Sequence, residues 1–217
     1  FKQPLTKLRG ISAMYSNYIQ IVARADAGIK SLKDLKGKRI SVGAAKSGTE
    51  LNARAVLAAA GIQYKDFAKV EYLPYAESVE LLKNRQIDVT LQSAGLGNPA
   101  LRDLASSVDI VFVPVPADVI KKIGDKAYLS ATIPADTYKG QSAAVPTTSI
   151  VNFLVTHEGV SADTVYKMTK AMFENLDKLV AAHAAAKGVK LENAAASMPI
   201  PLHPGAEKYY REKGLIK

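Results

Sequence analysis

The sequence predicts an α/β fold in which a parallel sheet is wound with helices. Short runs rich in valine and isoleucine alternate with amphipathic or alanine-rich segments between residues 38 and 124. Of the 217 residues, 48% are hydrophobic, which is enough to form a buried core. Because crossovers between parallel strands are right-handed, we expect helices on both faces of the sheet.

The elements follow one another in a regular order. The N-terminal stretch holds two strand-like runs, ISAMY and YIQIVARA, and then a short helical turn, SLKDLKG, with Ser31 as its expected cap. Four strand-and-helix pairs come next. Their strands are RISVG, KVEYL, IDVTLQS and DIVFVPV, and their helices cover residues 48–60, 76–85, 98–107 and 117–124.

The pattern changes after residue 124. Residues 126–149 are rich in Pro, Gly, Ser and Thr and predict a long irregular connection. A strand, SIVNFLVTH, follows this connection. A long helix over residues 161–183, with apolar residues at helical spacing, and a terminal helix over 204–214 complete the chain.

Positive charge is concentrated at the N-terminal end. Residues 1–40 hold nine Lys or Arg against two Asp, so they carry seven of the nine net positive charges. The charges are interleaved with strand-like apolar residues, which favours a solvated surface, but a basic segment can also attract nucleic acid or other anions. No aromatic-interleaved RNA motif and no DNA-recognition helix pattern is present, so we expect no nucleic-acid partner.

The composition excludes several kinds of chemistry. The chain has no cysteine, which excludes disulfides, thiolate nucleophiles and zinc–thiolate sites. No apolar run of 18 or more residues predicts a membrane-spanning helix. The first residues show no signal-peptide pattern and no methionine, and we interpret them as a processed or cropped end.

Enzyme signatures are also absent from the sequence. There is no G-x-S-x-G motif and no Ser followed three positions later by Lys. The histidines, His157, His183 and His203, lie far apart and lack metal-ligand spacing. Since nothing assembles a nucleophile, a base and an oxyanion site, we expect a protein that is not an enzyme and uses no metal or cofactor.

The junction SVGAAKSGTE carries the strongest binding signal. Ser47, Gly48 and Thr49 open a helix, and Lys46 adds charge nearby. Unpaired N–H groups and positive partial charge at a helix N-terminus suit a carboxylate or another anion, and hydroxyls add donors. Ser47 and Glu50 also fit a capping box, so a structural role is an open alternative. A nucleotide P-loop does not fit, because Thr49 stands where its lysine belongs.

Longer segments resemble one protein family, the TAXI (TRAP-associated extracytoplasmic immunogenic) solute receptors of tripartite ATP-independent periplasmic (TRAP) transporters. The similarity spans nearly all of the chain, and the combination of segments is specific, although SLKDLKGK alone occurs in many solute-binding proteins. The similar segments are YIQIVARADAGIKSLKDLKGKRISVGAAKSGTELNARAVLAAAGI, IDVTLQSAGLGNPALRDLA, TIPADTYKGQ, NFLVTHEGVSADTVYKMTKAMFENL and PIPLHPGAEKYYREKG.

The resemblance implies a two-lobed Venus-flytrap receptor of the type II periplasmic-binding class. Residues 32–144 would form the second lobe, and residues 1–31 and 145–217 the first. The family begins with a strand and a Gly/Thr-rich loop that have no counterpart before Phe1. We therefore expect the first lobe to be incomplete in this chain.

The resemblance also implies a function and a site. The receptor would capture a small organic anion in the periplasm, such as glutamate, another acidic amino acid or a dicarboxylate, and deliver it to the membrane permease subunits of a TRAP transporter. The expected ligand contacts are the helix N-terminus, the QSAG segment at the end of a strand, and three tyrosines, although core packing explains each tyrosine equally well. The candidates are Ser47, Gly48, Thr49, Gln92, Ser93, Ala94, Gly95, Tyr15, Tyr18 and Tyr75.

Two other classes share this architecture. The effector-binding domain of a LysR-type transcription regulator also binds small anions in two lobes, but it is cytoplasmic and follows a helix-turn-helix. The segment IPLHPGAEKYYREKG and the long helix over 161–183 resemble the receptor family instead. An amine-releasing deaminase on the same fold is disfavoured, because no catalytic constellation is found.

Overall fold

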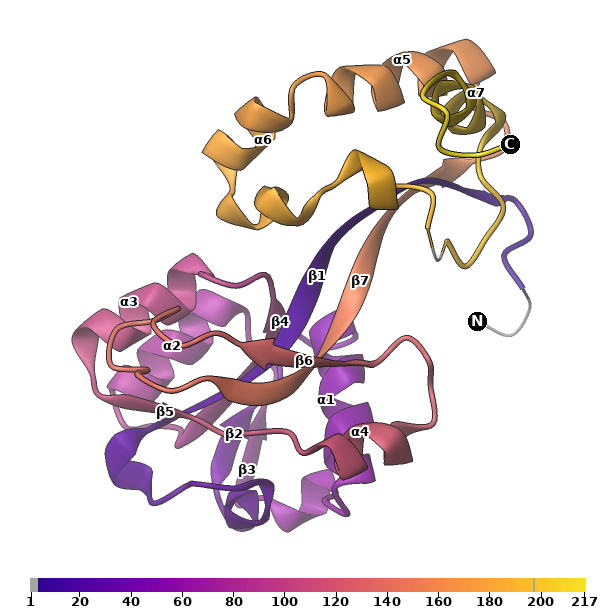
Figure 1. The fold of residues 1–217 in the computed structure, drawn as a ribbon. Coiled ribbons are helices and arrows are strands. Elements are labelled where there is room, and N and C mark those ends of the chain that lie inside the picture. Colours follow the sequence, from indigo (N-terminus) through magenta and orange to yellow (C-terminus); the bar gives the residue numbers. More distant parts are fainter. Residues whose placement is uncertain (1–3, 197) are drawn as a thin grey trace. The chain divides into compact units, whose positions relative to one another are not determined.

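The computed structural model describes residues 4–196 and 198–217 and confirms the predicted α/β class (Figure 1). Contacts divide the chain into two compact units. The sheet unit is Asn17–Ile150, and the terminal unit joins the segment ending at Ser16 to Val151–Lys217. Residues 17–31 and 145–150, which the sequence mapping assigned to the first lobe, belong to the sheet unit by these contacts. The assignment of lobes itself stays a prediction.

The described residues form one mixed sheet in the order β3-β2-β4-β1-β7-β6, with β5 paired to β1. β2 runs parallel to β3 and β4, whereas β1 runs antiparallel to β4 and β5. The strands are β1 (Leu8–Arg24), β2 (Arg39–Ser41), β3 (Lys69–Glu71), β4 (Val89–Ala94), β5 (Ile110–Phe112), β6 (Leu129–Ile133) and β7 (Val145–His157).

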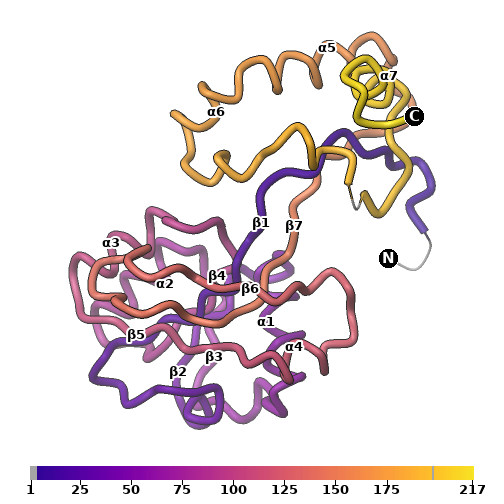
Figure 2. The backbone as a smooth tube through the Cα atoms, in the orientation of Figure 1, coloured from indigo at the N-terminus to yellow at the C-terminus, as the bar shows by residue number. Residues whose placement is uncertain are grey.

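The parallel arrangement predicted for residues 38–124 is confirmed for β2, β3 and β4. Two other expectations about the strands are wrong. The runs ISAMY and YIQIVARA do not form two strands but one unbroken strand of 17 residues, β1, which can be traced in Figure 2 and pairs antiparallel with β4. The residues between its two predicted halves include no Gly or Pro to end it. The connection over 126–149 is not irregular throughout, because Leu129 to Ile133 pair with Ser149 to Val145. Tertiary pairing overrides the weak local preference of this Ser- and Thr-rich segment.

The helices of the sheet unit lie where the sequence predicts them, and one helix of the terminal unit does not. The expected helix over 161–183 divides into α5 and α6 at Asn175, whose backbone is not helical and whose side chain bonds the carbonyl of Ala171. The helices are α1 (Gly48–Ala59), α2 (Tyr75–Lys83), α3 (Pro99–Ser107), α4 (Ala117–Ile123), α5 (Ala162–Phe173), α6 (Leu176–Ala182) and α7 (Pro204–Glu212).

The sheet unit has a hydrophobic cluster on each face of its sheet, as the crossover rule predicts. Leu91 of β4 packs with α1 and α4 in one cluster, whereas Val22 of β1 packs with α2 and α3 in the other. Side chains on successive strand residues point to opposite faces, which explains how one sheet serves both clusters. The N-termini of α1, α2 and α3 follow the carboxyl ends of their strands and share one edge of the sheet.

The terminal unit is built around the contact between α5 and α7. Its core is aromatic, and Tyr209 and Tyr210 are almost completely buried. Gly205 permits the close approach, because a Cβ there would lie 2.2 Å from the carbonyl oxygen of Ala162. In the described part of the chain, no helix combines the length and the apolar character needed to cross a membrane.

Candidate functional site

The N-terminus of α1 presents unused backbone donors. Ser47 caps the helix in an extended conformation, and its hydroxyl accepts a hydrogen bond from the N–H of Glu50 (3.2 Å). The Glu50 carboxylate bonds Arg54 and Tyr64 rather than the cap. Within the described residues, no protein group accepts from the N–H groups of Gly48 and Thr49.

The loop before α1 is shaped by two left-handed residues. Gly43 has φ of 91°, and a Cβ there would lie 2.6 Å from Cγ2 of Thr49. Only glycine therefore fits between the end of β2 and the first turn of α1. Lys46 has φ of 61° and is exposed next to the helix N-terminus.

A chain of hydrogen bonds joins the N-termini of α1 and α2 to the end of β4. The Tyr75 hydroxyl donates to the carbonyl of Ser93 (2.7 Å), so its one proton is used there. Thr49 Oγ1 lies 2.6 Å from the same hydroxyl and must act as the donor. The side-chain proton of Thr49 is therefore committed to Tyr75, and its backbone N–H is the group left for a solute.

A second set of bonds fixes the Ser93 side chain. Asn52 lies one turn into α1, and its Nδ2 donates to Ser93 Oγ (3.0 Å). The Tyr128 hydroxyl donates to Oδ1 of Asn52 (2.9 Å). Ser93 Oγ accepts in this bond and keeps its own proton as a donor.

The remaining QSAG residues belong to a separate buried network. Oε1 of Gln92 accepts from Asn98 Nδ2 (3.0 Å), while Nε2 of Gln92 has no partner among the described residues. Gln20 donates to the carbonyl of Ala94 (3.1 Å) and accepts from the hydroxyl of Tyr138. Burial raises the pKa of Tyr138, so this phenol stays protonated and can donate.

The carbonyl of Gly95 also faces this network, at 3.5 Å from Nε2 of Gln20. Gln92 is fully buried, so its side chain lines the protein interior in this structure. Of the QSAG segment at the end of β4, Ser93 alone hydrogen bonds to residues of α1 and α2.

The three predicted tyrosines lie in different surroundings. Tyr75 is bonded within the site as described above. Tyr18 is half-buried, pairs with Ala94 in the β1–β4 register and packs on the α2–α3 cluster. Tyr15 belongs to the terminal unit, where it stacks on His183 with ring centroids 6.2 Å apart.

The electrostatics of the α1 N-terminus favour an anion. Two free N–H groups, the roughly half-unit positive charge of a helix N-terminus and the exposed Lys46 all attract negative charge. Among the described residues, no cluster of His, Asp or Glu could hold a metal ion. The arrangement is thus suited to binding an acid group and contains no assembled nucleophile and base.

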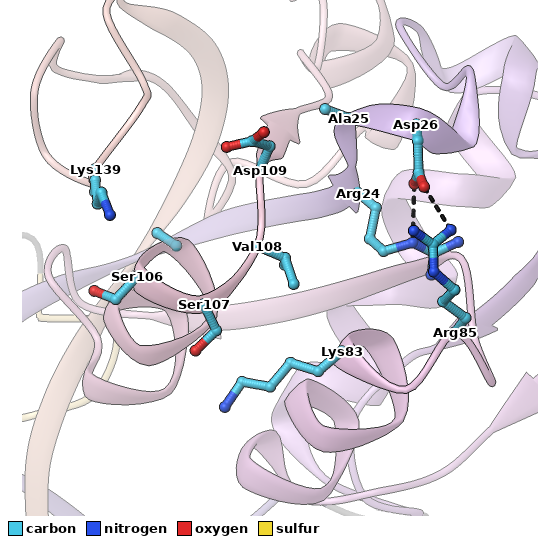
Figure 3. Close-up of a pocket in the computed structure, with 11 residues that line it drawn as sticks. Arg24, Ala25, Asp26, Lys83, Arg85, Ser106, Ser107, Val108, Asp109 and Lys139 are labelled. Atoms are coloured by element: carbon cyan, nitrogen blue, oxygen red, sulfur yellow. Dashed lines mark hydrogen bonds and ion pairs between the residues drawn. The ribbon is translucent and has the colours of Figure 1, made fainter.

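A hollow of about 450 Å³ lies elsewhere in the sheet unit, and Figure 3 shows its lining. Arg24 and Arg85 both bond Asp26 there, and Arg24 also donates to the carbonyls of Leu82 and Ile87. The guanidinium groups of Arg24 and Arg85 are thus already hydrogen bonded to acceptors of the protein itself. None of the predicted site residues lines this hollow.

The comparisons with known proteins identify the family. The family model described as the NMT1-like family matches residues 1–214, so the chain belongs to the NMT1-like family. This membership does not itself confirm the TAXI subfamily that the sequence resembles.

Solved structures with a similar fold include transport receptors. The periplasmic aliphatic sulphonate binding protein of Escherichia coli is 12% identical, with a TM-score of 0.47 over 84% of this chain and 52% of that one. A structure from Bordetella bronchiseptica is 19% identical, with a TM-score of 0.50 over 85% of this chain and 54% of that one. A mutant of ArgBP from T. maritima is 13% identical, with a TM-score of 0.46 over 83% of this chain and 61% of that one. This chain thus spans between half and two thirds of the length of these structures.

Sequence reasoning missed the residues that support the site. Asn52 lies three positions after Thr49 and therefore on the same side of α1, which was a usable signal. Other supporting hydrogen bonds join residues that are far apart in the sequence, and no local pattern predicts such contacts. They are made by Tyr128, Gln20 and Tyr138.

Proposed function

We propose that this protein is an extracytoplasmic solute-binding receptor that captures a small organic anion and delivers it to the membrane subunits of a transporter. Membership of the NMT1-like family supports this proposal. The resemblance to TAXI receptors supports a TRAP-type permease and a periplasmic location.

One observation carries the binding site: the free N–H groups of Gly48 and Thr49 at the N-terminus of a 12-residue helix. An acid oxygen of the solute accepts from both groups, and Lys46 adds a nearby positive charge. Each hydrogen bond to a charged ligand contributes about 1.5–3 kcal/mol. Tyr75 and Asn52 hold the surrounding elements in place through their bonds to Ser93.

The proposed solute class is an acidic amino acid such as glutamate or a dicarboxylate. A carboxylate offers two oxygens to a pair of adjacent N–H donors, and a sulfonate offers three. The ligand list for a test therefore extends to sulfonates as well as to carboxylates.

A thermal-shift screen of the full-length protein tests the proposal. The panel contains glutamate, aspartate, C4 and C5 dicarboxylates and aliphatic sulfonates, each beside its neutral amide or alcohol. A ligand at 100 times its Kd adds about 2.7 kcal/mol, which raises Tm by about 5–10 °C in a chain of this size. We expect at least one acid, and not its neutral analogue, to give such a shift. Equal shifts for acids and neutral analogues, or none for any acid, would contradict the proposal.

A further inference from the structure

The positive charge before residue 40 is not used by the proposed solute site. Three lysines of this segment lie near two lysines from later in the chain, on the surface of the sheet unit. We call this surface the basic face, and its exposed lysines are Lys30, Lys33, Lys36, Lys65 and Lys69.

Two short turns bring these lysines together. One is the 3₁₀ turn Leu32–Leu35, and the other is the 3₁₀ turn Tyr64–Asp66. The N–H of Gly37 donates to the carbonyl of Asp66 (2.7 Å), and the N–H of Ala68 donates to that of Lys38 (3.0 Å). The two turns are therefore neighbours in the fold.

The basic face lies at the sheet edge opposite the candidate site. Both turns directly precede the amino ends of β2 and β3, where Arg39 and Lys69 are register partners. The N-terminus of α1 instead follows the carboxyl end of β2. A partner on the basic face thus leaves the solute site uncovered within this unit.

The acidic residues of the face are turned toward the backbone. Asp34 accepts from the N–H groups of Lys30 and Ser31, and Asp66 accepts from that of Gln63. These backbone hydrogen bonds lower the pKa of both carboxyl groups. Each aspartate closes a capping box, so its carboxylate is occupied within its own turn.

The lysine side chains of the face have fewer and weaker protein partners than the two aspartates. In the described part of the chain, the side chains of Lys30, Lys33 and Lys65 make no hydrogen bond or ion pair. Lys36 lies 3.7 Å from Asp66, and Lys69 pairs with Glu71, both as exposed pairs of little strength. The face therefore presents positive charge outward.

Among the described residues, no large exposed hydrophobic side chain marks the face, and a hollow of about 490 Å³ lined by Leu57, Ile62 and Tyr64 adjoins it only at Lys65. None of the exposed large hydrophobic side chains identified in the described residues falls within 30–39 or 63–69. A protein–protein interface normally has a hydrophobic core surrounded by a polar rim. Flexible lysines spread over two turns, without such a core, suit a flat array of negative charges better than a folded partner.

We propose that the basic face binds the surface of anionic phospholipid membranes through the phosphate headgroups. Such electrostatic attraction contributes about 1 kcal/mol per Lys, or roughly fivefold in affinity, and weakens with salt. The interaction would hold the receptor near the membrane with the α1 N-terminus free to meet solute. It does not depend on the identity of the solute.

Vesicle co-sedimentation of the full-length protein tests this proposal. Phosphatidylcholine vesicles with about 30% phosphatidylglycerol are compared with pure phosphatidylcholine, at about 0.05 and 0.5 M salt. The face variant is K30Q/K33Q/K65Q. The matched control is K121Q/K126Q/K187Q, which removes three exposed lysines elsewhere and gives the same net charge.

We expect salt-sensitive binding to anionic vesicles only, with affinity reduced tenfold or more in the face variant and about threefold or less in the control. Three results would overturn the proposal: no binding to anionic vesicles, binding to neutral vesicles of equal strength, or equal loss in both triple variants. The last result would mean that net charge, and not this face, attracts the lipid. Circular dichroism checks that both variants keep the fold.

Discussion

Replacement of Tyr75 by Phe tests the hydrogen-bond chain that joins α1, α2 and β4. The change removes one hydroxyl and leaves the ring in place. The carbonyl of Ser93 then loses its donor, and Thr49 loses its acceptor, at two residues that are only 6% and 8% exposed. An unsatisfied buried group costs about 1–3 kcal/mol, and we expect the free energy of unfolding to fall by about 2 kcal/mol in total.

Urea unfolding measures this loss of free energy. In a thermal melt, Tm should fall by about 4–8 °C in a chain of this length. Tyr72→Phe is the matched control, because Tyr72 is 41% exposed and its hydroxyl makes no hydrogen bond within the described residues. Its loss should stay below about 0.5 kcal/mol. Equal effects of the two substitutions would refute the reasoning, since they would show that the Tyr75 hydroxyl does not connect these elements.

Two further substitutions probe the sheet unit. Gly43→Ala should lower the free energy of unfolding by about 2 kcal/mol or more, because the new Cβ would meet Thr49. Gly37→Ala places its Cβ in open space and should cost about 1 kcal/mol from the positive φ alone. Urea unfolding of the two variants measures this difference. Hydrogen bonds from the Arg39 side chain lower the pKa of Asp88 in the folded protein. The stabilisation from the Asp88–Arg39 pair is therefore complete above the unfolded pKa of about 3.9, and it is lost as pH falls through the lower folded pKa. Asp88→Asn should therefore flatten the fall of stability below about pH 4 in urea titrations, and an unchanged slope would argue against this pair.

The fold class and most helices could be predicted because they depend on local patterns. The helix starting at Gly48 has a cap and an apolar repeat, and its observed first residue agrees with the prediction. The direction of β1 could not be predicted in the same way, because pairing with β4 is decided by tertiary contacts. The break at Asn175 in the helix predicted over residues 161–183 depends on one residue whose helix preference is only weakly unfavourable.

The candidate site was predicted in part. The strand–helix junction indicated an anion-binding helix N-terminus, and the structure leaves the donors of Gly48 and Thr49 free. The sequence offered the hydroxyl of Thr49 as a further donor, but its proton goes to Tyr75. The hydrogen bond from Thr49 to Tyr75 joins residues 26 positions apart, and residue spacing in the sequence does not predict it. Whether the ten candidate residues contact a solute stays a prediction.

The most direct test of the central claim removes a single backbone donor. Gly48→Pro deletes one N–H at the first position of α1, where proline is well tolerated, and Ser47 already has the extended backbone (ψ 162°) that precedes proline. Gly48→Ala keeps the N–H and adds a Cβ into open space. Calorimetric titration with the acid selected by the thermal screen should show affinity reduced about 10–150-fold by proline, equal to about 1.5–3 kcal/mol, and little changed by alanine. Unchanged binding by the proline variant, or an equal loss in both, would contradict the claim that the α1 N-terminus binds the anion.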